Sequence, residues 1–186
     1  MNDILRNIEQ RKSVRKFTTL QVERDLVEMI LKAGFEAPSG HNSQPVHLTV
    51  VRDADVINQM NQSTKAIMAL SEVEWIQKFG THPKYHVLHE APTVVVVSSK
   101  NQCYSPAEDS SAAIQNMLLA ATSLGVGSVW IGLISVYLKT DDAKTLLSIP
   151  EGYTARYAVC FGFEDPEKVA TKPARKSEPI HWIESK

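Results

Sequence analysis

Apolar residues recur along the chain with two kinds of spacing, and each predicts one kind of element. Spacings of three and four residues are typical of amphipathic helices, and they place helices over about residues 1–8, 19–34, 53–70, 110–124 and 141–147. Continuous apolar runs bounded by turn residues are typical of strands, and they place strands over residues 46–51, 93–99, 126–134 and 157–163. We expect Thr18 or Thr19 to cap the second helix and Pro38 to limit its end.

Two of these segments are more apolar than an exposed element would be. Residues 93–99 (TVVVVSS) form a β-branched run that is typical of a strand covered on both faces. The helix over 110–124 is apolar around most of its circumference, and Gly125 follows where a left-handed residue commonly ends a helix. We therefore predict an α+β fold, with a central mixed, mainly antiparallel sheet flanked by helices. Residues 1–186 are expected to form a single domain, with 166–186 as an extended tail.

The composition is that of an ordinary globular protein. The 186 residues are 43% apolar and 22% charged, and the net charge is −1, without the basic excess typical of proteins that bind nucleic acid. No apolar run reaches the roughly 20 residues of a membrane helix, and the first residues do not follow a signal-peptide pattern. Cys103 and Cys160 form no disulfide framework. We therefore expect a cytoplasmic protein that binds neither nucleic acid nor membrane.

The segment RKSVR, residues 11–15, concentrates cations in a chain of balanced charge. If the segment is extended, Arg11, Ser13 and Arg15 share one face; if it is helical, the two arginines are still neighbours. Two guanidinium groups and a hydroxyl suit a phosphate dianion. The alternative is a solvated basic turn, which five residues alone do not exclude.

The loop APSGHNSQP, residues 37–45, supplies hydrogen-bonding side chains. Ser39, Asn42 and Gln44 can each donate and accept, which would match the alternating groups along the pyrimidine edge of a flavin. Gly40 allows a ligand to approach the backbone closely, and Pro45 is expected to hold Gln44 in extended geometry. A polar surface loop is the alternative interpretation.

A third stretch, SLGVGSVWIG (residues 123–132), combines a flexible backbone with a large ring. Gly125 and Gly127 free the chain between the buried helix and the next strand, and Trp130 offers a flat apolar surface. A helix end followed by a core strand with a buried tryptophan explains the same residues.

In their order and spacing, these stretches together resemble the FMN-dependent nitroreductases. RKSVRKF is followed by APSGHNSQPVHLTVV, then by AAIQNMLLAATSLGVGSVWIG, and finally by the basic tail KPARK. The resemblance extends from about Ile4 to Arg175. It implies the nitroreductase fold and an intertwined homodimer with FMN at the subunit interface, where the C-terminal tail packs on the partner subunit.

The resemblance also assigns roles to residues at the phosphate end of such a site. The family's phosphate- and ribityl-binding stretch matches Arg11, Lys12, Ser13 and Arg15. Arg175 matches a C-terminal basic residue that reaches the phosphate, and Lys172 or Lys176 could substitute for it. In such a dimer Gln115 and Asn116 would have a structural role in the core.

At the ring end, the resemblance points to the loop and to one strand. The loop that contacts the flavin, contributed by the partner subunit, matches Pro38, Ser39, Gly40, His41, Asn42 and Gln44. A backbone stretch beside the flavin matches Trp130, Ile131 and Gly132.

The activity that the resemblance implies is that of an NAD(P)H oxidoreductase. NADH or NADPH would reduce the bound FMN and leave, and a flat, electron-poor acceptor such as a nitroaromatic or a quinone would then be reduced in the same place, in a ping-pong sequence. The flavin carries the chemistry, so no catalytic side chain is assigned. Two alternatives remain open: a family variant such as a reductive dehalogenase, and a flavin-binding module that stores FMN or senses redox state.

The sequence departs from the family pattern in two places. Val46 stands where an aromatic residue is common, and residues 61–90, where relatives cover the substrate, match poorly. Within that segment HPKYHVLH spaces three histidines so that one helical face would hold them: His82, His86 and His89. We expect them to lie on a surface or pocket-lining helix and to bind no metal, because no cysteine accompanies them. Trp75, Ile76 and Phe79 are interpreted as packing residues or as an aromatic lid.

Overall fold

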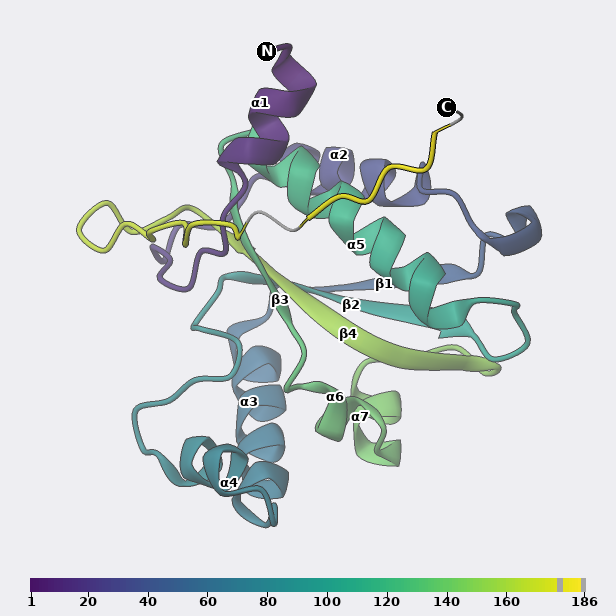
Figure 1. Cartoon of the computed structure of the whole chain (residues 1–186). Helices are drawn as coiled ribbons and strands as arrows, with labels where there is room; N and C mark the ends of the chain where they lie inside the picture. The colour runs from purple at the N-terminus through teal and green to yellow at the C-terminus, as the bar shows by residue number, and fades with distance from the viewer. Residues whose placement is uncertain (177–178, 185–186) are drawn as a thin grey trace.

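The computed structural model describes residues 1–176 and 179–184, in which one sheet lies between two layers of helices (Figure 1). The described elements, in chain order, are α1 (Asp3–Gln10), α2 (Arg24–Phe35), the 3₁₀ turn η1 (Gly40–Asn42), β1 (Val46–Val51), α3 (Ala54–Ala69), α4 (Glu74–Thr81), β2 (Thr93–Lys100), α5 (Pro106–Ser123), β3 (Gly127–Ile131), α6 (Ser135–Leu138), α7 (Asp141–Leu146) and β4 (Tyr153–Gly162). Within these residues no helix combines the length and the apolar character needed to cross a membrane.

The sheet has the strand order β1-β2-β4-β3, and all three neighbouring pairs are antiparallel. Val96 of β2, for example, lies opposite Thr49 of β1 on one side and Ala158 of β4 on the other. The predicted α+β class is confirmed. The sheet was predicted to be mixed and mainly antiparallel; the described part of the chain contains no parallel pair.

Strand β2 lies at the centre of two cores, as its valine run predicts. Val94 to Val97 are fully buried, and successive side chains enter opposite layers. Val95 and Val97 pack under α2 and α5, while Val94 and Val96 pack against α3, α6 and α7 (Figure 1). The candidate site described below lies mainly on the α5 side.

Helix α5 is the long element that positions both ends of that site. Its first residue is Pro106, a favoured residue at this position because its missing N–H has no helical partner there. The helix ends before Gly125, whose φ of +71° is the left-handed geometry that the sequence predicts. Gly34 of α2 lets the two helices approach, since a Cβ there would lie 2.8 Å from Cγ of Met117.

Several predictions at the ends of elements are wrong; α5 begins at Pro106 and not at residue 110, and β3 ends at Ile131 and not at residue 134. Thr18 and Thr19 do not cap α2, which begins at Arg24 after Glu23. Instead the backbone N–H of Thr18 donates to the carbonyl of Phe163, which keeps residues 16–19 beside the end of β4. Strand β4 begins at Tyr153, four residues earlier than expected, because it continues to pair with β2 beyond a bulge at Val97 and Ser98.

The histidine segment is also not helical. Helix α4, which the sequence pattern did not predict, ends at Thr81, and His82 is extended because Pro83 follows it. Residues 83–90 then form a succession of turns. His82, His86 and His89 therefore do not share a helical face, and no group of three or more potential metal ligands occurs in the part of the chain described.

Candidate functional site

Residues 11–15 run extended, which settles the two geometries that the sequence leaves open. Val14 is buried, and its backbone N–H donates to the carbonyl of Ser128 at 2.9 Å. Because side chains alternate along an extended chain, Arg11, Ser13 and Arg15 project from the opposite face. The sequence RKSVR is thus anchored to β3 by its one apolar residue.

Arg11 and Ser13 line a hollow of about 590 Å³ together with Arg175 from the tail and Trp130 from β3. The remaining lining residues come from three parts of the chain: Ile8 and Glu9 at the end of α1, Gln115 and Leu118 from α5, and Lys172. The Nζ of Lys172 donates to the carbonyl of Glu9, which ties the tail to α1. The hollow therefore gathers residues from both ends of the chain.

The two guanidinium groups in this hollow have no carboxylate partner in the part of the chain that the structure describes. None of the four ion pairs among residues 1–176 and 179–184 includes Arg11, Arg15 or Arg175. Partial burial, together with the nearby charge of Arg175, lowers the pKa of Arg11. Like charges brought together without a counterion are an arrangement that a bound anion would stabilise.

Trp130 forms one wall of the hollow. The next two residues, Ile131 and Gly132, can contribute only backbone atoms to it. The ring of Trp130 meets that of Tyr157 edge to face, with centroids 5.0 Å apart. The side chain of Ile131 is buried in the other core, beneath α3 and α6. Gly132 follows the strand, with open space around the position of a Cβ.

Lys12 is not brought to this hollow. It projects from the same face of the extended segment as Val14, where its Nζ lies 2.8 Å from a carboxylate oxygen of Glu164 and 3.1 Å from the carbonyl of Ala170. This ammonium is already paired. Its place in the structure is a link between the N-terminal segment and the start of the tail.

Arg15 lies farther along, beside the turns that follow α4. Its charge acts on Tyr85 and His89. Burial, followed by the charges of Arg15, His86 and Lys16, lowers the pKa of His89 to about 4. The imidazole is therefore neutral at neutral pH.

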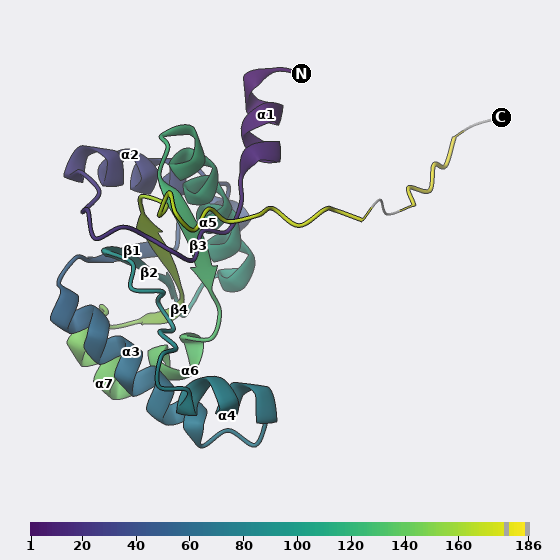
Figure 2. The ribbon, with the colours of Figure 1, turned by 90° about the vertical axis from the view of Figure 1, so that its left-hand side faces the viewer.

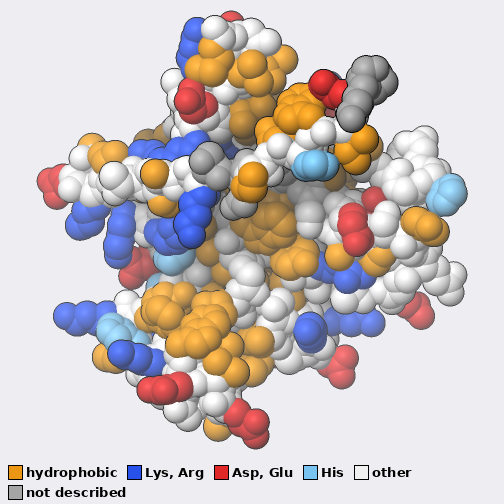
Figure 3. Space-filling view, in the orientation of Figure 1, with side chains coloured by type: hydrophobic (Ala, Val, Ile, Leu, Met, Phe, Trp, Pro, Cys, Tyr) orange, Lys and Arg blue, Asp and Glu red, His pale blue; other side chains and the backbone are white. Residues whose placement is uncertain are grey.

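Aromatic rings continue from His89 to the surface of α4. Tyr85 lies 6.4 Å from His89 and 4.6 Å from Phe79, and Trp75 lies 6.3 Å from Phe79, measured between ring centroids. Trp75 and Phe79 are exposed, and Figure 3 shows an apolar patch over α4 with cationic side chains beside it. An apolar, aromatic surface thus begins where the row of Arg11, Ser13 and Arg15 ends.

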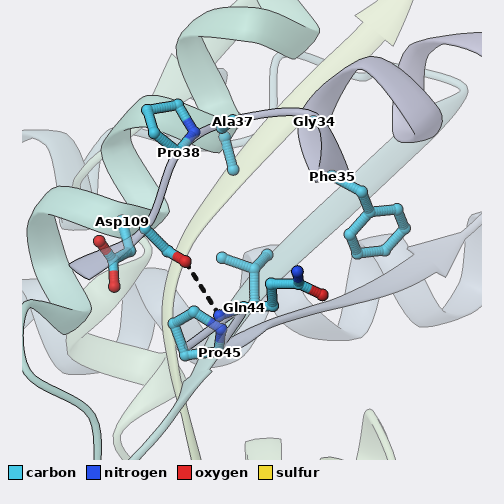
Figure 4. A pocket seen from close by; sticks show the side chains of 10 residues that line it. Gly34, Phe35, Ala37, Pro38, Gln44, Pro45 and Asp109 are labelled. Carbon is cyan, nitrogen blue, oxygen red and sulfur yellow. Dashed lines mark hydrogen bonds between the residues drawn. The ribbon is translucent and has the colours of Figure 1, made fainter. Parts of the chain in front are cut away.

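The loop over residues 38–44 lies near the start of α5, where it lines a second hollow of about 290 Å³ (Figure 4). The hydroxyl of Ser39 accepts from the backbone N–H of Gln44 at 2.9 Å, and the side-chain amide of Gln44 donates to Asn42 at 3.2 Å. The ring of His41 meets Tyr104 edge to face. These contacts hold the polar side chains of the loop in a defined arrangement.

The backbone of this loop differs from the prediction. His41, Asn42 and Gln44 have φ values of 53°, 54° and 44°, so Gln44 is left-handed and not extended. The residue before a proline normally avoids helical geometry, but here the Ser39 hydroxyl captures the N–H of Gln44 and turns the chain. Three left-handed residues without glycine are a costly local arrangement.

The loop and the arginine hollow are not brought together within one chain. Asp109 and Ala113 line the loop hollow, whereas Gln115 and Leu118 line the other one, on a different face of α5. From Asp109 to Leu118 the helix rises about 14 Å. The predicted site residues therefore form two separate groups.

Some residues of these groups were not predicted. Asp109 and Ser105 hold the loop: Oδ1 of Asp109 accepts from the N–H of Gly40 at 3.0 Å and from the hydroxyl of Ser105 at 2.9 Å. Gln115 was expected in a dimer core but lines the arginine hollow. Asn116 does have a structural contact, because its side chain donates to the carbonyl of Ala33 at the end of α2.

Comparison with known proteins agrees with the fold and with these motifs. The sequence pattern of the Nitroreductase family matches residues 8–163, and the chain belongs to this family. A protein of Archaeoglobus fulgidus with the provisional name NADH dehydrogenase/NAD(P)H nitroreductase is 33% identical over 173 residues, 90% of this chain and 89% of that protein. The NADPH-flavin oxidoreductase of Vibrio harveyi is 29% identical over 178 residues, 94% of this chain and 72% of its own length.

A solved structure extends the likeness to three dimensions. A nitroreductase from Bacteroides fragilis with bound FMN superposes with a TM-score of 0.92 at 29% identity, covering 99% of this chain and all of that one. The match therefore includes the N-terminal segment, the loop and most of the tail, the three regions that supply the candidate site.

Proposed function

We propose that the chain is an FMN-dependent NAD(P)H oxidoreductase that reduces flat, electron-poor acceptors such as nitroaromatics or quinones. The observation that carries this proposal is that Arg11 and Arg175, in a hollow walled by Trp130, form no ion pair within residues 1–176 and 179–184. The names of the relatives, which include an NADPH-flavin oxidoreductase and an FMN-bound nitroreductase, support the same reading.

The residues present fit FMN at its phosphate end. Arg11 and Arg175 offer two planar donors for a phosphate group, and the hydroxyl of Ser13 lies between Arg11 and Arg15 on the same face. Because Arg11 is partly withdrawn from water, its hydrogen bonds to an anion gain strength; Arg175 is exposed. Lys12, paired with Glu164, would act indirectly by holding the tail that carries Arg175.

The other end of the site would come from a second copy of the chain. The amides of Asn42 and Gln44 suit the pyrimidine edge of a flavin, but in one chain they lie on a different face of α5 from Arg11. The chain also exposes apolar side chains on α1 and in the tail, both of which stand out from the body (Figure 2): Ile4, Leu5, Ile8, Ile180, Trp182 and Ile183. A homodimer would bury them and complete two sites.

In this arrangement the tail over residues 166–186 packs on the partner subunit, and the chain acts as one domain in the cytoplasm. Residues 177–178 and 185–186 of the tail lie outside the described residues. Residues 179–184 are exposed, and three of them are large and apolar. Such a segment is expected to find an apolar surface on another subunit.

When bound, FMN supplies the redox chemistry, accepting a hydride from NADH or NADPH and passing reducing equivalents to the acceptor. The chain's own residues bind and orient the cofactor and exclude water from it. Trp130 and the backbone at Ile131 and Gly132 would bound the cofactor. The aromatic rings from His89 to Trp75 would provide an apolar surface against which a flat acceptor can lie. No catalytic side chain is required for this work.

Anaerobic reduction of the purified protein tests the activity. We expect a yellow protein whose visible absorption bleaches with NADH or NADPH and recovers rapidly when a quinone is added. Flavin that stays oxidised with both nucleotides would indicate a storage or sensing module instead. A protein that stays colourless after incubation with excess FMN would contradict the proposal.

Sedimentation equilibrium tests the shared site. We expect the FMN-loaded protein to be a dimer and a variant lacking residues 179–186 to dissociate more readily, because this deletion removes Ile180, Trp182 and Ile183 but keeps Arg175. A flavin-loaded monomer would contradict the proposal that two chains form each site.

A further inference from the structure

The 39–44 loop holds an unfavourable backbone that its internal bond between Ser39 and Gln44 explains only in part. Left-handed geometry is uncommon for residues other than glycine, yet His41, Asn42 and Gln44 all adopt it. Such conformations persist only where the surroundings determine them. Contacts from outside the loop are therefore expected to help hold it.

Asp109 is the residue that reaches the loop from the body of the protein. It lies in the first turn of α5 and is only 5% exposed. One of its oxygens, Oδ1, accepts from both Gly40 N and Ser105 Oγ, at 3.0 and 2.9 Å. Gly40 is close enough for this bond because it has no side chain: a Cβ there would lie 2.6 Å from Ser105 Oγ. A single carboxylate thus fastens the loop at the residue preceding His41.

Asp109 is poorly explained by stability alone. It forms no ion pair in the described part of the chain, and its second oxygen, Oδ2, is buried without a hydrogen-bond partner there. Burying an incompletely paired carboxylate lowers stability. Residues that lower stability are typical of functional sites, where geometry matters more than packing.

We propose that Asp109 is a positioning residue for the FMN site. By fixing Gly40, it holds the following left-handed residues so that the amides of Asn42 and Gln44 face the flavin bound by the other subunit. The role of Asp109 rests on the proposed function, because it presumes that the loop contacts FMN. In this role Asp109 acts through its bond to Gly40, which precedes the residues held by the Ser39–Gln44 turn.

Two substitutions of Asp109 and one matched control test the role. Asp109→Ala removes the acceptor, and we expect FMN affinity, measured by flavin fluorescence quenching, to fall about 10-fold. Asp109→Asn keeps an oxygen for Gly40 and places nitrogen where Oδ2 has no partner, so affinity should stay within about threefold of the native value. The control is Ser110→Ala, which removes a fully buried hydroxyl that bonds only to Pro106 within the same helix.

The reduction potential of the bound flavin provides a readout that simple destabilisation would not change. We expect it to shift in Asp109→Ala, because the amides then face the ring differently, and to stay unchanged in Asp109→Asn and Ser110→Ala. Should Asp109→Ala fail to fold, Gly40→Ala replaces it: Asp109 is intact, but the added Cβ meets Ser105 Oγ and displaces the loop. We expect the same loss of affinity.

Hydrogen exchange of the loop separates this inference from the proposed function. In Asp109→Ala the amides of residues 40–44 should exchange at least about 10-fold faster than in the native protein, whether or not FMN is present. Unchanged exchange and affinity would overturn the positioning role, as would an equal loss in Ser110→Ala. If the native protein binds no FMN, the proposed function fails, and the exchange experiment still decides whether Asp109 holds the loop.

Discussion

The two ends of the candidate site are built in opposite ways. In the arginine hollow, Arg11 and Arg175 lie near one another without a carboxylate partner among the described residues. In the 39–44 loop, the backbone N–H groups of Gly40 and Gln44 are already bonded, to Asp109 and to Ser39. The first end depends on charge that a ligand brings; the second depends on geometry that exists before the ligand arrives.

This difference indicates that the two ends of the site have separate roles in binding. Charge attracts an anion from a distance, and the guanidinium groups then hold its phosphate by charged hydrogen bonds. A rigid hydrogen-bonding loop adds little attraction but selects shape and orientation. We therefore expect the arginine end to determine how tightly FMN is held and the loop end to determine how its ring is placed.

The largest expected effect is the loss of the arginine pair. Replacing Arg11 and Arg175 with alanine should weaken FMN binding about 100-fold or more, because each charged hydrogen bond contributes about 1.5–3 kcal/mol. Riboflavin, which lacks the phosphate, should bind the variant and the native protein alike. Arg24→Ala, which breaks an exposed pair with Glu28 far from the site, is the matched control. An equal loss of riboflavin and FMN binding would contradict the assignment of the arginines to the phosphate end.

Ionic strength should act on one end only. Raising the salt concentration from 50 to 500 mM should weaken FMN binding to the native protein by several-fold, because added ions screen the partly exposed guanidinium groups. Riboflavin binding, and FMN binding to the double alanine variant, should change much less. A salt dependence that survives removal of both arginines would place the controlling charge elsewhere.

A smaller effect is expected from the loop. Ser39→Ala removes the acceptor for the N–H of Gln44, and a hydrogen bond of this kind contributes about 1 kcal/mol. FMN and riboflavin should therefore both bind about fivefold more weakly, with the salt dependence unchanged. Ser43→Ala is a suitable control in the same loop. Weakened binding of FMN alone would contradict the assignment of the loop to the ring end.

At His89, beside Arg15, the expected effect is on stability and not on FMN binding. The pKa of His89 is about 4 in the folded chain and 6.5 ordinarily, so the unfolded chain binds the proton at a higher pH. The contribution to stability is complete above about pH 6.5 and is lost as the pH falls toward 4. His89→Asn, which tolerates the left-handed backbone there, should flatten this part of the curve of melting temperature against pH. The control variant His82→Asn should leave this part of the curve unchanged.

The same histidine reports on the charge of Arg15. Because that charge helps to lower the pKa of His89, Arg15→Ala should raise it, as measured by NMR titration. An unchanged pKa would mean that the charge of Arg15 acts on other groups and not on His89.

The sequence was sufficient for the framework because apolar periodicity reports burial directly. The valine run of β2, the apolar α5 and the left-handed Gly125 all follow from local pattern, and β1 has the predicted bounds. For residues 11–15 the sequence predicted that the two arginines share a face, but only Arg11 lines the hollow, and Arg15 lies farther along, near His89.

What escaped prediction depends on contacts between distant residues. The bond from Gly40 to Asp109 spans 69 positions. No local sequence pattern at either residue predicts this contact. The left-handed geometry of Gln44 overrode the usual effect of a following proline because Ser39 offered a competing acceptor. Pairing with Glu164 withdrew Lys12 from the cation cluster although its place in RKSVR suggested membership.

If two chains share each site as proposed, the placement of the two hollows on different faces of α5 has a genetic consequence. A chain defective in its arginines and a chain defective in its loop would each be inactive alone, yet a mixed pair would contain one intact site. Random mixing of the two should therefore recover about a quarter of the native flavin sites, since half of the pairs are mixed and half of their sites are sound. Two harmful alleles of this gene would then complement one another in the same cell.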